Sequence, residues 1–307
     1  MKKFLISMVL GFTTVTSFAQ SSNIFAERAD LIRRLGTSQS YSMGWYTGAL
    51  SNNDNDIREI NENFLGLSNY LSIRLNNLIV LETIKSDRVV GEEGLKGNFD
   101  LLYTSSLIGS QLIEKGWKPI VERTESITPI VLALKSNKRL NSEKDFSKSK
   151  IIGSNGITYT MLSYTLTNNK VADVNVLNKN GNIISKKISQ ENLVNVLNNQ
   201  QADGIVIRSF LAEKLLAESD KYKIVYKGQS VPGHMIVLNP KVDSVREEQI
   251  RSVFLSLNSL DKKSVVLKAI DGHNPKLELF KSVSQEGINL SSAVFKKTKQ
   301  IPLNNVK

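Results

Sequence analysis

The spacing of hydrophobic positions predicts a helix followed by a strand early in the chain. Ile60, Phe64 and Leu67 recur every three or four positions within residues 57–75, which is the period of a helix with one buried face. Residues 75–84 then carry a nearly continuous apolar run, which is typical of a buried strand. This order of a helix and then an apolar strand is the first sign of a mixed α/β chain.

The same alternation continues through most of the sequence. We expect further strands at residues 41–50, 98–106, 150–154, 171–178 and 202–209. We expect further helices at residues 87–96, 106–116, 157–169, 189–200, 210–219 and 246–260. Strands and helices that alternate with short connections predict an α/β fold whose sheets are mixed and mostly parallel.

Two extended segments, near residues 124–132 and 228–238, divide the pattern into two α/β units. Two crossings predict a two-lobed clamshell that closes about a hinge. We expect lobe 1 at residues 38–127 and 233–307, lobe 2 at 128–232, and a polar lead-in at 20–37.

The first 19 residues have the pattern of a Sec signal peptide. Lys2 and Lys3 precede an apolar run, and small residues at Ser17 and Ala19 predict cleavage before Gln20. An uncleaved N-terminal anchor is the alternative. The chain has no cysteine, so we expect no lipid anchor and a soluble periplasmic protein.

The charge balance favours anionic partners. Forty Lys and Arg residues against 29 Asp and Glu residues give a formal net charge of +11. The lysines are scattered and do not form a basic stripe with interleaved aromatic residues, so we expect no nucleic-acid partner.

Hydroxyl and amide residues gather where predicted strands give way to helices. Thr104 and Ser105 follow one strand, and a second group opens the helix predicted at 157–169. The start of a helix offers unpaired N–H groups and a partial positive charge, which suit an oxyanion. The second group consists of Ser154, Asn155, Gly156 and Thr158. Capping of their own helices is the alternative role for these residues.

One arginine and two tyrosines complete the candidate site. Arg208 directly follows an apolar strand and could hold a carboxylate or phosphate with two parallel hydrogen bonds, although a solvated arginine is the alternative. Arg123, near the first crossing, is a weaker candidate. Trp45 and Tyr46 lie on opposite faces of a strand, and we expect Tyr46 to face the ligand. Tyr103 could pack in the core or face the ligand, and we favour the ligand.

Several segments in order resemble a known family. The segments are DLLYTSS (100–106), GSNGITYTMLSYTL (153–166), QADGIVIRSFLAEKL (201–215) and GQSVPGHMIVLNPKV (228–242). Together they resemble the periplasmic solute-binding proteins of type 2 fold that serve phosphate, phosphite and phosphonate uptake. The resemblance implies that Tyr103, Thr104 and Ser105 match a tyrosine-bearing strand end, and that residues 154–158 match the helix start of the second lobe. The chain departs from the family in having fewer hydroxyl groups at that helix start. Some phosphonate binders of the family also carry a histidine in the second lobe, whereas His234 and His273 of this chain lie outside the matching segment.

The resemblance implies an exported solute-binding protein that captures a small anion between two lobes and delivers it to an ABC-type importer. A ligand-sensing protein that docks a membrane sensor is the alternative, and an exported hydrolase is the third hypothesis. We expect no enzyme, because the sequence has no GxSxG, P-loop or HExxH motif. We also expect a monomer, no cofactor and no metal.

Overall fold

The computed structural model describes residue 26 and residues 28–35, 40–47, 54–84, 86–154, 183–186, 190–271 and 279–298. Its strands are β1 (Ser40–Tyr46), β2 (Leu78–Ile84), β3 (Leu101–Ser105), β4 (Lys118–Arg123), β5 (Ser126–Ile127), β6 (Pro129–Leu134), β7 (Ile151–Ser154), β8 (Ile183–Lys186), β9 (Gly204–Arg208), β10 (Tyr222–Lys227), β11 (Val231–Pro232), β12 (His234–Leu238) and β13 (Phe280–Lys281). Its longer helices are α2 (Asp54–Leu75), α3 (Asp87–Lys96), α4 (Ser106–Glu114), α7 (Gln190–Asn198), α8 (Ser209–Glu218), α9 (Val245–Ser256), α10 (Val265–Asp271) and α11 (Gln285–Thr298). Two 3-10 helices are η1 (Glu143–Lys148) and η2 (Leu257–Ser259).

The strands form two large sheets and one small one. The six-stranded sheet has the order β13-β4-β12-β3-β1-β2, and the five-stranded sheet has the order β10-β6-β9-β7-β8. β1 runs parallel to β2 and β3, and β7 runs parallel to β8 and β9, whereas β6 is antiparallel to β9 and β10. Strands β5 and β11 pair with each other alone. The predicted α/β fold with mixed sheets is confirmed.

The chain divides into two compact units, one within residues 1–103 and 236–281 and the other within 104–235 and 282–307. The boundaries of this division fall inside strands β3 and β12. The two units are described separately below.

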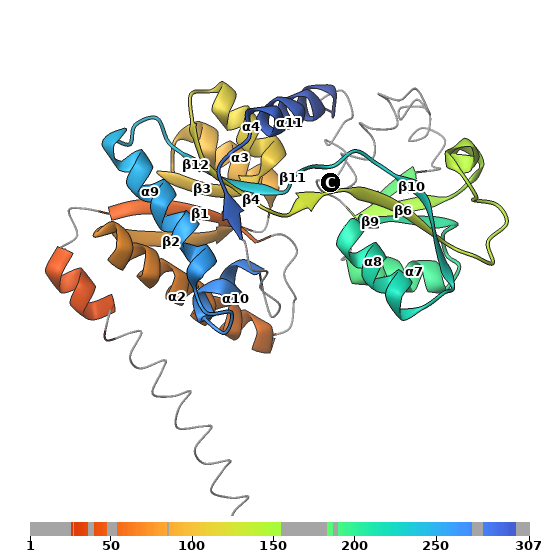
Figure 1. Cartoon of the computed structure of the whole chain (residues 1–307), viewed down its shortest axis with the longest axis horizontal. Coiled ribbons are helices and arrows are strands. Elements are labelled where there is room, and N and C mark those ends of the chain that lie inside the picture. The colour runs from red at the N-terminus through yellow and green to blue at the C-terminus, as the bar shows by residue number, and fades with distance from the viewer. Residues whose placement is uncertain are drawn as a thin grey trace, which may run out of the picture. The chain divides into compact units, whose positions relative to one another are not determined.

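In the first unit, the alternation of side chains along β1 separates two faces. Trp45 is only 2% exposed, and its ring lies 6.0 Å from the ring of Phe64 on α2 in an edge-to-face arrangement. Gly44 points to the opposite face, where an added Cβ would come within 2.6 Å of a Leu102 methyl group. Figure 1 shows α2 and α3 on opposite faces of these strands. A larger residue at position 44 would therefore have to displace the side chain of Leu102.

The strand predicted at 75–84 differs from expectation in its position. β2 lies at the edge of the six-stranded sheet, and the side chain of Val80 is 49% exposed. The expectation of a buried strand was wrong, because an apolar run of this length does not distinguish a central strand from an edge strand. A hollow of about 610 Å³ opens between β2 and α3, lined in part by Val80, Glu82, Val89 and Glu93.

In the second unit, α7 and α8 cover one face of the five-stranded sheet (Figure 1). Leu193 of α7 and Ala212 of α8 join Ile205 and Ile207 of β9 in a buried hydrophobic core. On the other face, the ring of Phe146 from η1 lies 5.9 Å from the ring of Tyr226. Both faces of the sheet are thus covered, which explains the unbroken apolar run of β9.

Some predicted elements cannot be compared with the structure. The signal peptide, the helix expected at 157–169 and the strand expected at 171–178 lie outside the described residues. Conversely, the sequence pattern did not predict β8, α10, β13 or α11. None of the helices described is both long and apolar enough to cross a membrane.

Candidate functional site

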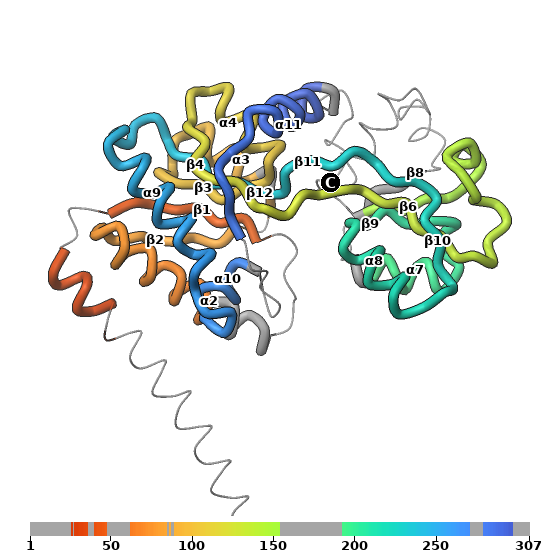
Figure 2. The backbone as a smooth tube through the Cα atoms, viewed as in Figure 1, coloured from red at the N-terminus to blue at the C-terminus, as the bar shows by residue number. Residues whose placement is uncertain are grey.

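Two segments far apart in sequence form a narrow antiparallel ribbon in the second unit. We call residues 125–129 and 228–233 the ribbon. Val231 pairs with Ile127, and the N–H of Gly233 donates to the carbonyl oxygen of Glu125 at 3.1 Å. Figure 2 shows the two segments running side by side. These segments lie within the two extended stretches that the sequence predicts, and their role as crossings between lobes stays a prediction.

The close approach within the ribbon requires glycine at position 233. A Cβ on Gly233 would lie 2.7 Å from the carbonyl oxygen of Glu125, which is shorter than any ordinary contact. At the other end of the ribbon, the hydroxyl of Thr128 donates to the hydroxyl of Ser230 at 2.9 Å. These contacts fix where the strands that leave the ribbon begin and end.

Three basic side chains come from strands that end or begin at this ribbon. Arg123 is the last residue of β4, two positions before the ribbon, and His234 is the first residue of β12. Arg208 ends β9 opposite Pro129, and the next residue, Ser209, donates its N–H to Thr128 at 3.0 Å. The ribbon thus brings together three side chains that are separated by up to 111 positions in the sequence.

Of these three basic side chains, Arg123 is buried, and Arg208 and His234 are half-buried. Arg123 is 4% exposed, and its Nη2 atom lies 3.9 Å from a carboxylate oxygen of Glu125. The Nη1 atom of Arg123 and the Nε atom of Arg208 are both buried. An arginine stays protonated in proteins. Burying the guanidinium group of Arg123 therefore costs free energy, which the Glu125 carboxylate or an anion bound nearby would offset.

The surroundings of His234 at the ribbon disfavour the protonated form of its imidazole. Burial is the main cause that holds the pKa of its imidazole well below the usual range, and the positive charges of Arg208 and Arg123 lower that pKa further. His234 is therefore neutral at pH 7, with one ring nitrogen able to donate and the other able to accept a hydrogen bond. We call Arg123, Arg208 and His234 the basic cluster.

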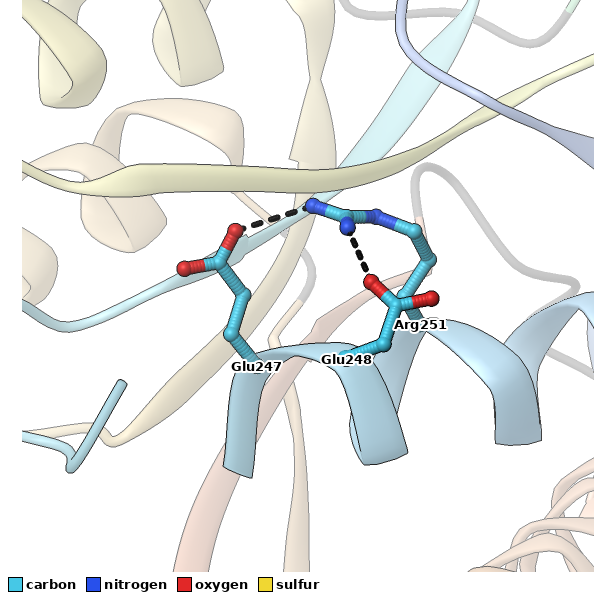
Figure 3. Close-up of polar contacts among 3 residues, drawn as sticks. All are labelled: Glu247, Glu248 and Arg251. Carbon is cyan, nitrogen blue, oxygen red and sulfur yellow. Dashed lines mark hydrogen bonds and ion pairs between the residues drawn. The ribbon is translucent and has the colours of Figure 1, made fainter. Parts of the chain in front are cut away.

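Charged side chains on the helix α9 are partly solvated. On α9, Arg251 forms ion pairs with Glu247 at 2.9 Å and Glu248 at 2.5 Å (Figure 3). The side chain of Arg251 is 28% exposed and that of Glu248 is 78% exposed. Such helix-surface pairs are screened by water and contribute little to stability. Arg123 of the basic cluster differs from them in its burial.

The predicted ligand-facing Tyr103 lies in the hydrophobic core of the first unit. Its ring stacks on Trp45 with the ring centroids 4.1 Å apart, and it meets Phe280 edge to face. Only 5% of Tyr103 is exposed. Trp45 is the buried member of the Trp45–Tyr46 pair, as expected, whereas Tyr46 at the end of β1 is half-buried.

The hydroxyl residues after Tyr103 are used in the architecture of the second unit. The Oγ of Ser105 accepts a hydrogen bond from the N–H of Ile108 at 3.4 Å and so caps α4. Ser106 donates its hydroxyl to the carbonyl oxygen of Pro232 at 2.6 Å, which ties α4 to the ribbon. Thr104 is fully buried. The capping role that the sequence left open for Ser105 is therefore present.

The other predicted donors lie largely beyond the described part of the chain. Asn155, Gly156 and Thr158 are outside the described residues, and Ser154 is placed as the last residue of β7 without its side chain. Their predicted role in anion binding stays a prediction.

The sequence analysis did not predict His234 as a site residue, and it ranked Arg123 as a weaker candidate than Arg208. Their proximity to Arg208 depends on the pairing of β5 with β11, which no local pattern reveals. A usable signal was present in Pro232-Gly233-His234, where a turn pair precedes the strand at the second crossing. Across the described residues, no group of three or more His, Asp or Glu residues is placed to hold a metal ion.

The hollow between β2 and α3 has a different chemistry from the basic cluster. Its polar lining includes the carboxylates of Glu82 and Glu93, and no arginine, lysine or histidine is among its lining residues. An anion would be repelled there. The basic cluster is therefore the better candidate for a site that binds an anion.

Comparison with known structures defines the class of fold. The Xanthomonas citri protein XAC2383 bound to ATP superposes with a TM-score of 0.68 and 13% identity, covering 86% of this chain and 99% of its own. PhnD1 from Prochlorococcus marinus (MIT 9301), in complex with methylphosphonate, gives a TM-score of 0.64 and 15% identity, with coverage of 85% and 99%. The chain thus has the type 2 periplasmic-binding-protein fold that its sequence predicts.

A third structure extends this likeness to a sulfonate-binding protein. The periplasmic aliphatic sulphonate binding protein SsuA from Escherichia coli matches with a TM-score of 0.55 and 10% identity, covering 88% of this chain and 95% of its own. At these identities, the structural likeness establishes the fold alone. No curated protein matches the sequence.

The family is established by the sequence itself. Residues 52–284 match the model of the family described as "ABC transporter, phosphonate, periplasmic substrate-binding protein". The match spans most of the chain, and the protein belongs to this family. The resemblance drawn from the order of its sequence segments is confirmed. The protein is therefore a periplasmic solute-binding protein of an ABC transporter.

Proposed function

We propose that this solute-binding protein captures a small oxyanion at the basic cluster. The observation that carries the proposal is the gathering of the buried Arg123 and the half-buried Arg208 beside the neutral imidazole of His234. Arg208 would hold two anion oxygens with parallel N–H groups, Arg123 would add charge, and His234 would donate one hydrogen bond. The net charge of +11 would assist the capture of an anion.

The ligands of the similar proteins support an anion. Methylphosphonate and ATP, each bound by one of these structures, carry negative charge, and the family model names phosphonate. We propose further that the lobes are residues 38–127 with 233–307 and residues 128–232, and that the bound anion shifts a population towards a closed state. In this proposal, the chain delivers its ligand unchanged to a permease and catalyses no reaction.

Isothermal titration calorimetry tests the proposal. The purified protein is refolded once to strip bound ligand and titrated with methylphosphonate, inorganic phosphate and sulfate. Arg208→Ala should weaken the binding of the preferred anion by about 100-fold or more, since truncating a buried charged contact costs about 2–5 kcal/mol. Arg208→Lys should recover only part of the affinity, because an ammonium group lacks the planar pair of parallel N–H groups with which a guanidinium holds two oxygens.

Arg251→Ala is the matched control. It removes an arginine that belongs to the solvated ion pairs of α9, so the affinity should stay within about twofold. Equal losses in Arg208→Ala and Arg251→Ala would show that the basic cluster is not the binding site. A refolded wild type that binds none of the three anions would contradict the proposed oxyanion.

A further inference from the structure

A second concentration of positive charge lies in the segment of the second unit that connects β6 to β7. Residues 135–150 form a loop and the helix η1, which Figure 2 shows as the yellow-green tube at the right. The segment has six basic residues against two acidic ones, and all six basic residues are exposed. We call these six the lysine surface: Lys135, Lys138, Arg139, Lys144, Lys148 and Lys150.

Nearby carboxylates are engaged by the backbone of this segment. The carboxylate of Asp145 accepts the N–H groups of Asn141 and Ser142 at 2.9 and 3.0 Å. The carboxylate of Asp203, at the start of the neighbouring β9, accepts the N–H of Lys150 at 2.8 Å. Among the residues that the structure describes, no carboxylate forms an ion pair with any member of the lysine surface. The positive charges are therefore left facing water.

The segment that carries the lysine surface is held in place. Leu140 and Phe146 are both fully buried and anchor it to the second unit. The ammonium group of Lys223, on β10, donates to the carbonyl oxygen of Asn137 at 3.0 Å and to the side-chain oxygen of Asn141 at 2.7 Å. These contacts present the exposed basic residues from a fixed backbone.

The composition of the lysine surface indicates the kind of partner that it fits. None of the exposed large hydrophobic side chains of the described chain lies within residues 135–150. The cores of protein interfaces are rich in aromatic residues and poor in lysine, and single-stranded nucleic acid is bound by stacking on aromatic rings. A layer of anionic lipid headgroups attracts exposed lysine and arginine through charge alone. A lipid surface therefore fits better than a protein or a nucleic acid.

We propose that the lysine surface binds the anionic phospholipid headgroups of the membrane that carries the transporter. The family serves an ABC transporter, so the protein works beside a membrane. Attraction to that membrane concentrates the protein where its permease lies. This role goes beyond the proposed capture of an oxyanion and is independent of it, because the lysine surface shares no residue with the basic cluster.

Vesicle co-sedimentation tests the proposal. The protein without its predicted signal peptide is mixed with vesicles of phosphatidylcholine, or of phosphatidylcholine with phosphatidylglycerol. We expect binding to the phosphatidylglycerol vesicles alone, and we expect added sodium chloride to release the protein, since salt screens exposed charges. Replacing four lysines of the lysine surface by glutamine should weaken this binding at least about tenfold, because each lysine near an anionic leaflet adds to the attraction. The four replaced residues are Lys135, Lys138, Lys144 and Lys148.

A matched variant separates the lysine surface from the net charge of the protein. It replaces four other exposed lysines by glutamine and so removes the same charge, and its vesicle binding should stay within about threefold of the wild type. Its four positions are Lys115, Lys241, Lys262 and Lys263. Circular dichroism of both variants checks that the fold is intact.

Three outcomes would overturn the proposal. Equal losses in the two variants would assign the attraction to net charge and not to the lysine surface. Equal binding to both kinds of vesicle would show that anionic headgroups are not recognised. A protein that ignores all vesicles but is captured by an immobilised poly-aspartate peptide would have an acidic protein as its partner and not a lipid.

Discussion

The end of β3 and the basic cluster at the ribbon use polar side chains in opposite ways. At the end of β3, Tyr103 is stacked in the core and Ser105 caps α4. At the ribbon, Arg123 and Arg208 bring buried positive charge next to His234. Both regions place polar residues where ligands commonly gather in α/β sheets. The comparison teaches that a hydroxyl group at the end of a strand readily forms a hydrogen bond with a nearby backbone group. A buried charge costs too much free energy to serve only such a structural purpose.

This difference has a simple energetic basis. A hydroxyl satisfied by a backbone group contributes about 1 kcal/mol, and helix starts need such caps wherever they occur. A buried guanidinium costs several kcal/mol before any partner compensates for it. The following predictions test which of the two regions serves stability and which serves ligand binding.

The largest effect is expected at the end of β3. Tyr103→Ala removes a ring stacked on Trp45 in the core, which should lower the free energy of unfolding by about 3–5 kcal/mol. Urea denaturation followed by circular dichroism measures the loss. Tyr103→Phe keeps the ring pair and should retain most of the stability and the full ligand affinity. A Tyr103→Phe protein that is stable but has lost its ligand would assign Tyr103 to the binding site.

An intermediate effect is expected where α4 meets the ribbon. Ser106→Ala leaves the carbonyl oxygen of Pro232 without the hydroxyl that bonds to it at 2.6 Å, which should cost about 1–3 kcal/mol of stability. Ser110→Ala in the same helix is the control, because that hydroxyl bonds to Leu107, three positions earlier in α4. Ser110→Ala should change stability by less than half as much. Equal unfolding midpoints for the two variants would rule out a special role for the Ser106 contact.

The smallest effect is expected from protonation at the basic cluster. The pKa of His234 is lowered in the folded protein, so below about pH 6.5 the unfolded chain binds a proton that the folded protein resists. Stability conferred by His234 is thus present above that pH and falls as the pH drops towards the folded-state pKa. The slope from one such group is at most about 1.4 kcal/mol per pH unit.

His234→Gln removes this proton linkage. Urea midpoints measured at pH 7.5 and 5.5 without ligand should fall less in His234→Gln than in the wild type. The carboxylates titrate in both proteins, so the difference between the two slopes isolates His234. An identical change of urea midpoint with pH in the two proteins would mean that His234 has an ordinary pKa, which neither burial nor the arginines lower.

Local patterns predicted the elements, and tertiary contacts decided how they are used. The helix at 54–75 and the strands β3, β7 and β9 were predictable because side-chain periodicity is a property of consecutive residues. The exposed position of β2 was not predictable, because edge and central strands can carry the same apolar run. Arg208 was predicted as a candidate from its place after an apolar strand, and its role in anion binding remains a prediction.

The sequence by itself determined the α/β class, the two extended segments and the family, because each depends on local periodicity or on the order of segments along the chain. Only the tertiary structure decided which polar residues became caps, which aromatic rings became core, and that His234 joins Arg123 and Arg208. The physical reason is that burial and electrostatic potential are set by neighbours far apart in sequence. The pairing of β5 with β11 brings such neighbours together.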